Sequence, residues 1–90
     1  MTPYEKCLLE NMLDALDRLF DQQSSVIDVW ALLFATGEAL RDTPHYSEFV
    51  NPSAELSVLI RSAQSEKAER ETALKITGNL RHYLAGLPLN

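Results

Sequence analysis

The apolar residues recur at three- and four-residue steps over most of the chain, which predicts an all-helical protein. The first helix is expected from Pro3 to about Gln22. It begins with a Thr-x-x-Glu capping box formed by Thr2 and Glu5, and a proline suits its first position. Its inward face is predicted to consist of Leu9, Met12, Leu13, Leu16, Leu19 and Phe20.

The second helix is expected from the cap Ser25 to about Arg41, and it is apolar on most of its circumference. Such a helix is normally the one around which the others pack, so Trp30 is assigned to the core. β-Branched and aromatic residues make a strand conceivable for residues 26–34. The chain offers no second run that could pair with it, and a helix is therefore predicted.

Two prolines divide the next part of the chain. Thr43-Pro44 and Asn51-Pro52 are each predicted to open a short helix, because proline is tolerated at the first helical position. Ser65 caps the last helix, which ends before Gly86, and Gly78 inside it is interpreted as a point of close helix crossing. The sequence thus predicts one all-α domain over residues 1–90, a compact bundle of about five helices, two of them short, with irregular or orthogonal packing.

Composition limits the classes of protein to which this chain can belong. The chain has 90 residues, a net charge of −5 and one cysteine. Folding buries about 64% of the surface of such a chain, which gives a thin core. Its bases are spread singly, which argues against direct nucleic-acid binding. It shows no signal peptide, and its longest near-apolar stretch, residues 29–35, is too short to span a bilayer. We therefore expect a cytoplasmic protein with no membrane contact.

Residues suited to catalysis are few and far apart. Cys7, His45 and His82 are not linked by any local motif, and the sequence has neither a nucleophile elbow nor a glycine-rich phosphate loop. No metal-ligand spacing is present. We predict no catalytic, cofactor or metal site, with Cys7 as a partly buried thiol, His45 on the surface and His82 favourable at a helix C-terminus.

Acidic residues form the most informative pattern. Glu10, Asp14, Asp17 and Asp21 follow one another at steps of 4, 3 and 4, which places them within roughly 60° of helical arc. This stripe flanks the apolar face and is expected to border a groove or the junction with the second helix. Residues 1–48 carry nine acids and three bases, whereas residues 49–90 carry four acids and five bases. A basic protein surface is the natural partner of such a face, although a solvated face that aids solubility explains it equally well.

The proline-bounded connector carries Tyr46, Glu48 and Phe49. These residues are interpreted either as an aromatic and acidic contact patch or as a lid that closes the bundle.

The acidic capped first helix, the segment Ser25–Thr36 and the closing segment Leu80–Ala85 together resemble small helical immunity proteins of bacterial toxin–immunity systems, particularly those of contact-dependent growth inhibition. The resemblance implies a non-enzymatic cytoplasmic protein that binds the toxin domain of a cognate secreted effector. Such toxins are often nucleases, whose basic substrate cleft an acidic face can block. The candidate partner-binding residues are Glu10, Asp14, Asp17, Asp21, Asp28, Tyr46 and Glu48.

The alternative is a non-enzymatic helical adaptor or regulatory module. It could be a homodimer that buries apolar surface around Trp30 and Leu33, since an oligomer buries what a small monomer cannot. Between these oligomeric states, a monomer is favoured over a homodimer.

Overall fold

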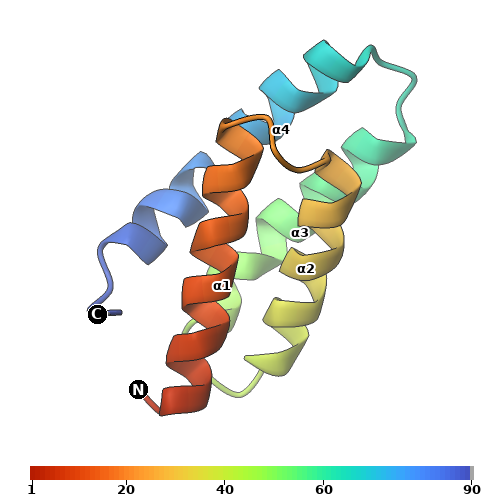
Figure 1. Ribbon diagram of the computed structural model, residues 1–90. Helices are drawn as coiled ribbons and strands as arrows, with labels where there is room; N and C mark the ends of the chain where they lie inside the picture. Colours follow the sequence, from red (N-terminus) through yellow and green to blue (C-terminus); the bar gives the residue numbers. More distant parts are fainter. Residues whose placement is uncertain (90) are drawn as a thin grey trace.

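The computed structural model describes residues 1–89, which form four helices and no strand. The helices are α1 (Pro3–Phe20), α2 (Val26–Ala39), α3 (Tyr46–Arg61) and α4 (Glu66–Ala85) (Figure 1). The all-α prediction is confirmed, and the expected number of about five helices is wrong by one.

Three of the predicted helix starts, those capped by Thr2, Ser25 and Ser65, are confirmed by their hydrogen bonds. The backbone N–H of Glu5 donates to Thr2 Oγ1, and the backbone N–H of Thr2 donates to Glu5 Oε2, each at 3.1 Å. The side chains of Ser25 and Ser65 each accept from a backbone N–H three residues later, at 3.2 Å. These caps satisfy N–H groups that have no partner within the helix.

The two short helices predicted after Thr43 and Asn51 are in fact one helix, α3, which continues through Pro52. A proline inside a helix removes one hydrogen bond and costs about 3 kcal/mol. Phe49 and Leu56 are two turns apart on either side of Pro52, and both are buried. Burying such side chains contributes about 1.5–3 kcal/mol each. A continuous helix keeps both on the core face, which offsets the cost of the proline.

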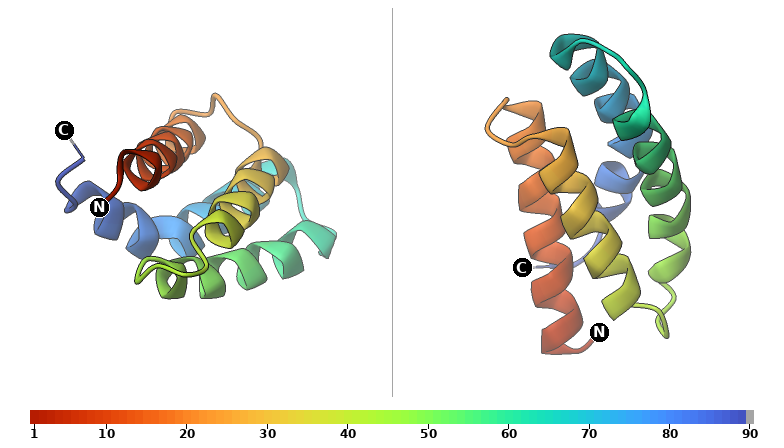
Figure 2. Two further views of the ribbon diagram at one scale, coloured as in Figure 1. Left: turned by 90° about the horizontal axis from the view of Figure 1, so that it is seen from below. Right: turned by 90° about the vertical axis from the view of Figure 1, so that its right-hand side faces the viewer.

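The four helices form two antiparallel pairs, α1 with α2 and α3 with α4, and the second pair crosses the first obliquely (Figures 1 and 2). Viewed from below, α3 and α4 run lengthwise across the view, whereas α1 and α2 are seen nearly end-on (Figure 2). Within residues 1–89, α1 and α3 are the pair of helices that do not meet. Each helix contacts its neighbours in the sequence, and α4 also contacts α1.

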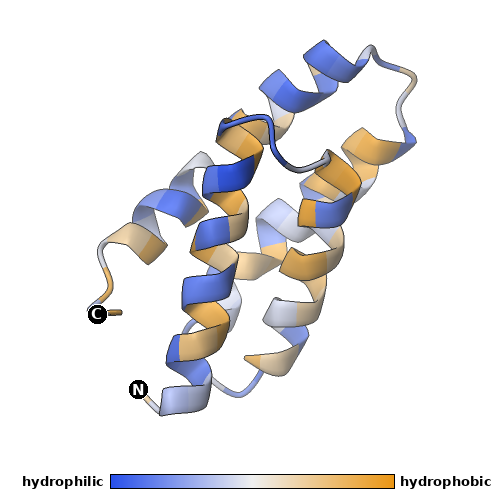
Figure 3. Ribbon diagram, in the orientation of Figure 1, coloured by the Kyte–Doolittle hydropathy of each residue, from blue (hydrophilic) through white to orange (hydrophobic). Residues whose placement is uncertain are grey.

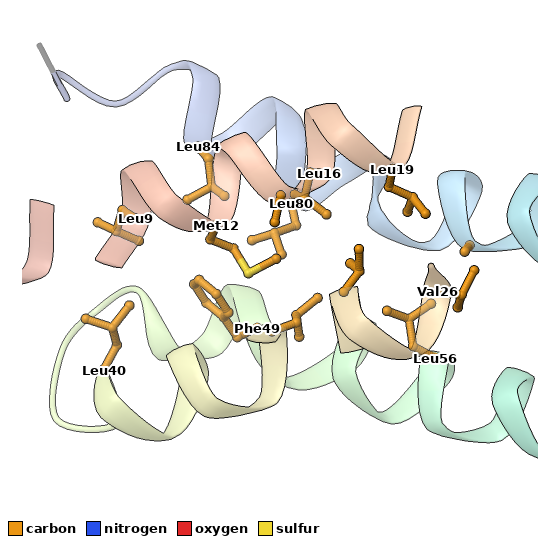
Figure 4. Close-up of a cluster of buried hydrophobic side chains, with 14 of the residues drawn as sticks. Leu9, Met12, Leu16, Leu19, Val26, Leu40, Phe49, Leu56, Leu80 and Leu84 are labelled. Carbon is orange, nitrogen blue, oxygen red and sulfur yellow. The ribbon is translucent and has the colours of Figure 1, made fainter. Parts of the chain in front are cut away.

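One cluster of buried side chains lies between the two pairs (Figure 4). Figure 4 shows the leucines of α1 and α4 pointing toward side chains of α2 and α3, with Phe49 near the middle. The largest fully buried side chains are Leu9, Met12, Leu16, Leu19, Val29, Leu33, Leu40, Phe49, Leu56, Leu80 and Leu84. Helical spacing predicted Leu9, Met12, Leu16 and Leu19 among them. Phe20, which was expected on the same face, is 64% exposed, and Trp30, which was assigned to the core, is only half-buried at its edge.

Arg70 of α4 forms hydrogen bonds to the connection between α1 and α2. Its Nη1 atom donates to the backbone oxygens of Leu19 at 2.9 Å and of Ser24 at 3.0 Å. The chain turns at Gln22, whose φ of 61° is unusual for a residue other than glycine. The Leu19 oxygen also accepts from the backbone N–H of Gln22 at 3.2 Å, and Ser24 lies in the loop, so the guanidinium links the end of α1 to the loop that leads to α2.

The close helix approach occurs at Gly37 and not, as the sequence suggested, at Gly78. A Cβ atom placed on Gly37 would lie 3.1 Å from the Cβ of Phe49, whereas a Cβ on Gly78 would meet nothing within 4 Å. Gly37 is therefore the position that lets α2 and α3 pack closely.

Alanine substitutions at these two glycines should have opposite effects. Alanine favours the helix by up to about 1 kcal/mol over glycine, so Gly78→Ala should stabilise the protein by about that amount. Gly37→Ala should instead lower the free energy of unfolding by about 1–2 kcal/mol, because overpacking against a buried ring outweighs the helix preference. Chemical denaturation of the two variants measures both values, and a stabilised Gly37→Ala protein would contradict the packing argument.

Candidate functional site

The acidic stripe lies along α1 and borders α4. Asp14 and Asp21 are exposed, whereas Glu10 and Asp17 are half-buried. Arg81 of α4 donates from Nε to Asp17 Oδ1 at 2.7 Å. The expected border with a groove or with the second helix is thus replaced, at Asp17, by a contact with α4.

Arg81 occupies one acid of the stripe and leaves the others free. Its guanidinium also lies over the ring of Phe20, 5.9 Å from the centroid. Within the part of the chain that the structure describes, Glu10, Asp14 and Asp21 have no ion-pair partner within 4.0 Å. We define these three carboxylates as the acidic face of α1.

The remaining candidate partner-binding residues lie on other helices. Asp28 is exposed in the first turn of α2. Tyr46 is the half-buried first residue of α3, and the guanidinium of Arg41 lies over its ring, 6.0 Å from the centroid. Glu48 is exposed in the first turn of α3. Glu10, Asp14 and Asp17 therefore lie on α1 with Asp21 as its C-cap residue, and the other three candidates lie on α2 and α3.

The connector between α2 and α3 is tied to α4. His45, which was expected on the surface, is half-buried, and its Nδ1 lies 2.6 Å from the hydroxyl oxygen of Tyr83. Phe49 is fully buried, so it belongs to the core and not to a contact patch. Burial raises the pKa of the Tyr83 phenol above its usual value of 10.0, and the negative charge of Glu48 raises it further.

The isolated reactive residues do not form a recognisable site. Cys7 is exposed on α1, contrary to the partly buried thiol that the sequence suggested, and its sulfur lies 3.8 Å from the side-chain nitrogen of Asn11. His82 is in the last turn of α4. Among residues 1–89, no three histidine, cysteine or acidic side chains are grouped so that they could hold a metal ion. None of the helices described is both long and apolar enough to cross a bilayer.

Sequence reasoning missed a groove between α2 and α3. It has a volume of about 290 Å³, and its walls include Trp30, Phe34, Tyr46 and Val50. The rings of Trp30 and Phe34 lie 6.0 Å apart, and the indole N–H of Trp30 is buried with no acceptor in residues 1–89. The signal was present in the sequence, since α2 is apolar around most of its circumference (Figure 3).

No protein-family model matches the chain, and searches of curated proteins and of solved structures found no similar protein. What these surfaces can bind must therefore be argued from their own chemistry.

The raised pKa of Tyr83 predicts a loss of stability at high pH. Below pH 10 the phenol is neutral in both the folded and the unfolded chain, and this contribution is fully present. Above pH 10 the unfolded chain loses the proton first, so the folded state loses stability as pH rises through the folded pKa. Tyr83→Phe should remove this part of the decline. Urea denaturation at pH 8 and at pH 11 measures it, and an equal decline in both proteins would refute the assignment.

Proposed function

We propose that this protein binds and neutralises the toxin domain of a cognate secreted protein, in the manner of the immunity proteins it resembles. The acidic face of α1 carries the proposal. Its three carboxylates, Glu10, Asp14 and Asp21, have no cationic partner among the described residues. The chain as a whole has a net charge of −5. The proposed partner is a domain with a basic surface, such as the substrate cleft of a nuclease.

The spacing of the carboxylates suits an extended row of positive charge. The three unpaired carboxylates are four and seven residues apart, which corresponds to rises of about 6 Å from Glu10 to Asp14 and about 10.5 Å from Asp14 to Asp21. A row of this kind attracts a basic cleft over a distance of about one Debye length and accelerates association. Occupying the cleft would exclude the nucleic acid, because both ligands would need the same cations.

The contact between Arg81 and Asp17 supports this role without taking part in it. It joins the middle of the stripe to α4, at a point where the guanidinium also covers Phe20. The pair is about half exposed, so its contribution to stability is small. Its effect is to hold α1 against its neighbour, and a face fixed before binding has less to lose in conformational freedom.

Charge reversal on the acidic face tests the proposal. Asp14→Lys combined with Asp21→Lys should slow association with the toxin domain at least about tenfold at low salt. Asp17 is kept, because it holds Arg81. The binding partner used in this experiment is the C-terminal domain of the protein encoded by the adjacent upstream gene. Stopped-flow mixing at low and at high salt measures the association rate, and the difference between wild type and variant should shrink as salt is added.

A matched control separates the position of the charges from their number. Glu55→Lys combined with Glu71→Lys changes the net charge equally at exposed acids of α3 and α4. It should slow association far less than the α1 variant, and circular dichroism checks that both variants fold. Equal effects of the two variants would refute the acidic face. Failure of wild type to bind the domain or to protect cells from it would refute the function itself.

A further inference from the structure

Phe20, the last residue of α1, is exposed at the end of the acidic stripe. Its side chain is 64% exposed, whereas Leu16, one turn earlier, and Leu19, the preceding residue, are fully buried. Phe20 therefore stands at the border where the apolar face of α1 meets the surface. Aromatic side chains in such positions are enriched in protein interfaces, where a few residues carry most of the affinity.

The ring of Phe20 already contacts one cation of the fold. The guanidinium of Arg81 lies over it, 5.9 Å from the ring centroid. The same guanidinium donates from Nε to Asp17 Oδ1 at 2.7 Å, and Asp17 precedes Phe20 by three residues on the neighbouring turn of α1. The ion pair holds the cation beside the electron-rich face of the ring. Most of the ring still faces solvent, so it has surface for a further contact.

The charges around Phe20 favour a second cation. The charge of Arg81 is balanced by Asp17. Asp21, which directly follows Phe20, is exposed and has no ion-pair partner among the described residues. Two carboxylates and one guanidinium thus surround the ring, and their sum is negative. A positively charged side chain is attracted to this place, and an acidic one is repelled.

The other exposed aromatic rings lack this setting. Tyr4 is 63% exposed and Phe34 is 52% exposed. Tyr4 is followed by Glu5, whose carboxylate accepts a capping hydrogen bond at 3.1 Å. Phe34 is followed one turn later by Glu38, which lies 3.6 Å from an arginine. Phe20 differs from both because the carboxylate next to it has no partner within residues 1–89.

We propose that Phe20 anchors the basic partner, with its exposed ring packed against a lysine or arginine side chain of that partner and with Asp21 facing the charge of this side chain. The inference rests on the proposed function and names the contact that retains the partner. The cations of a basic cleft stand on long methylene stems, which can cover an apolar ring while the charged head stays beside a carboxylate. A cation over an aromatic face adds to this attraction.

The ring and the carboxylates act at different stages of binding. The unpaired charges along α1 attract the partner before contact, and they therefore determine the association rate. The ring interacts only after the two surfaces meet, so it determines how long the complex lasts. Loss of the ring should accordingly speed dissociation, whereas charge reversal on the acidic face of α1 should slow association.

Stopped-flow displacement of the complex with the toxin domain tests the anchor. Phe20→Ala should raise the dissociation rate at least about tenfold and change the association rate at low salt by less than about twofold. Phe20→Trp, which keeps an aromatic face, should dissociate within about threefold of the wild-type rate. Tyr4→Ala is the matched control, because it removes an equally exposed ring of α1. It should leave both rates unchanged, and urea denaturation checks that each variant folds.

Arg81→Gln distinguishes direct contact from an effect through the fold. If Phe20 acted only by supporting Arg81, Phe20→Ala would have no further effect once the arginine is replaced. A ring that touches the partner should matter in both backgrounds. Adding Phe20→Ala to Arg81→Gln should therefore raise the dissociation rate again, by at least about fivefold.

An unchanged dissociation rate for Phe20→Ala, measured while wild type binds the domain, would overturn the anchor and leave the proposed function standing. The anchor is equally refuted if Tyr4→Ala speeds dissociation as much as Phe20→Ala, or if Phe20→Ala has no effect in the Arg81→Gln background. Failure of wild type to bind the domain would overturn the proposed function and the anchor together, so the wild-type measurement distinguishes the two failures.

Discussion

The close approach of α2 and α3 at Gly37 is the constraint on which the rest of the fold depends. It places the Cβ of Phe49 only 3.1 Å from the position that a Cβ atom at residue 37 would take. Phe49 is thereby held at the centre of the core, and α3 must continue as one helix to bury Leu56 two turns later. The same approach fixes the two walls of the groove, since Trp30 and Phe34 line it from α2 and Val50 lines it from α3.

Two arginines of α4 have structural roles that the sequence did not indicate. Arg70 donates to two backbone oxygens at the end of α1, and Arg81 pairs with Asp17 in the middle of the acidic stripe. Residues about fifty to sixty positions apart in sequence thus join the last helix to the first. The other carboxylates of the stripe, Glu10, Asp14 and Asp21, have no ion-pair partner among the described residues.

Local signals allowed the starts of α1, α2 and α4 to be predicted, because a cap needs only a side chain and an N–H three residues away, whereas α3 begins at Tyr46 without a side-chain cap. The helical spacing likewise indicated the leucines of the core. The continuous α3 was not predictable in the same way. Pro52 is a strong local signal for a break, and only the burial of Phe49 and Leu56 against other helices outweighs it. The partners of Asp17 and His45 come from α4, at separations of 64 and 38 residues, and no spacing in the sequence indicates such contacts.

The surface carries two kinds of exposed groups. Carboxylates without cationic partners among the described residues lie along α1, and large apolar side chains are exposed on α2 and α3 as well as at Tyr4 and Phe20 of α1. A charged row attracts a partner from a distance but adds little affinity at physiological salt, whereas an apolar face adds affinity only after contact. In a chain with so thin a core, an uncovered face like that of α2 exposes area that folding alone does not bury.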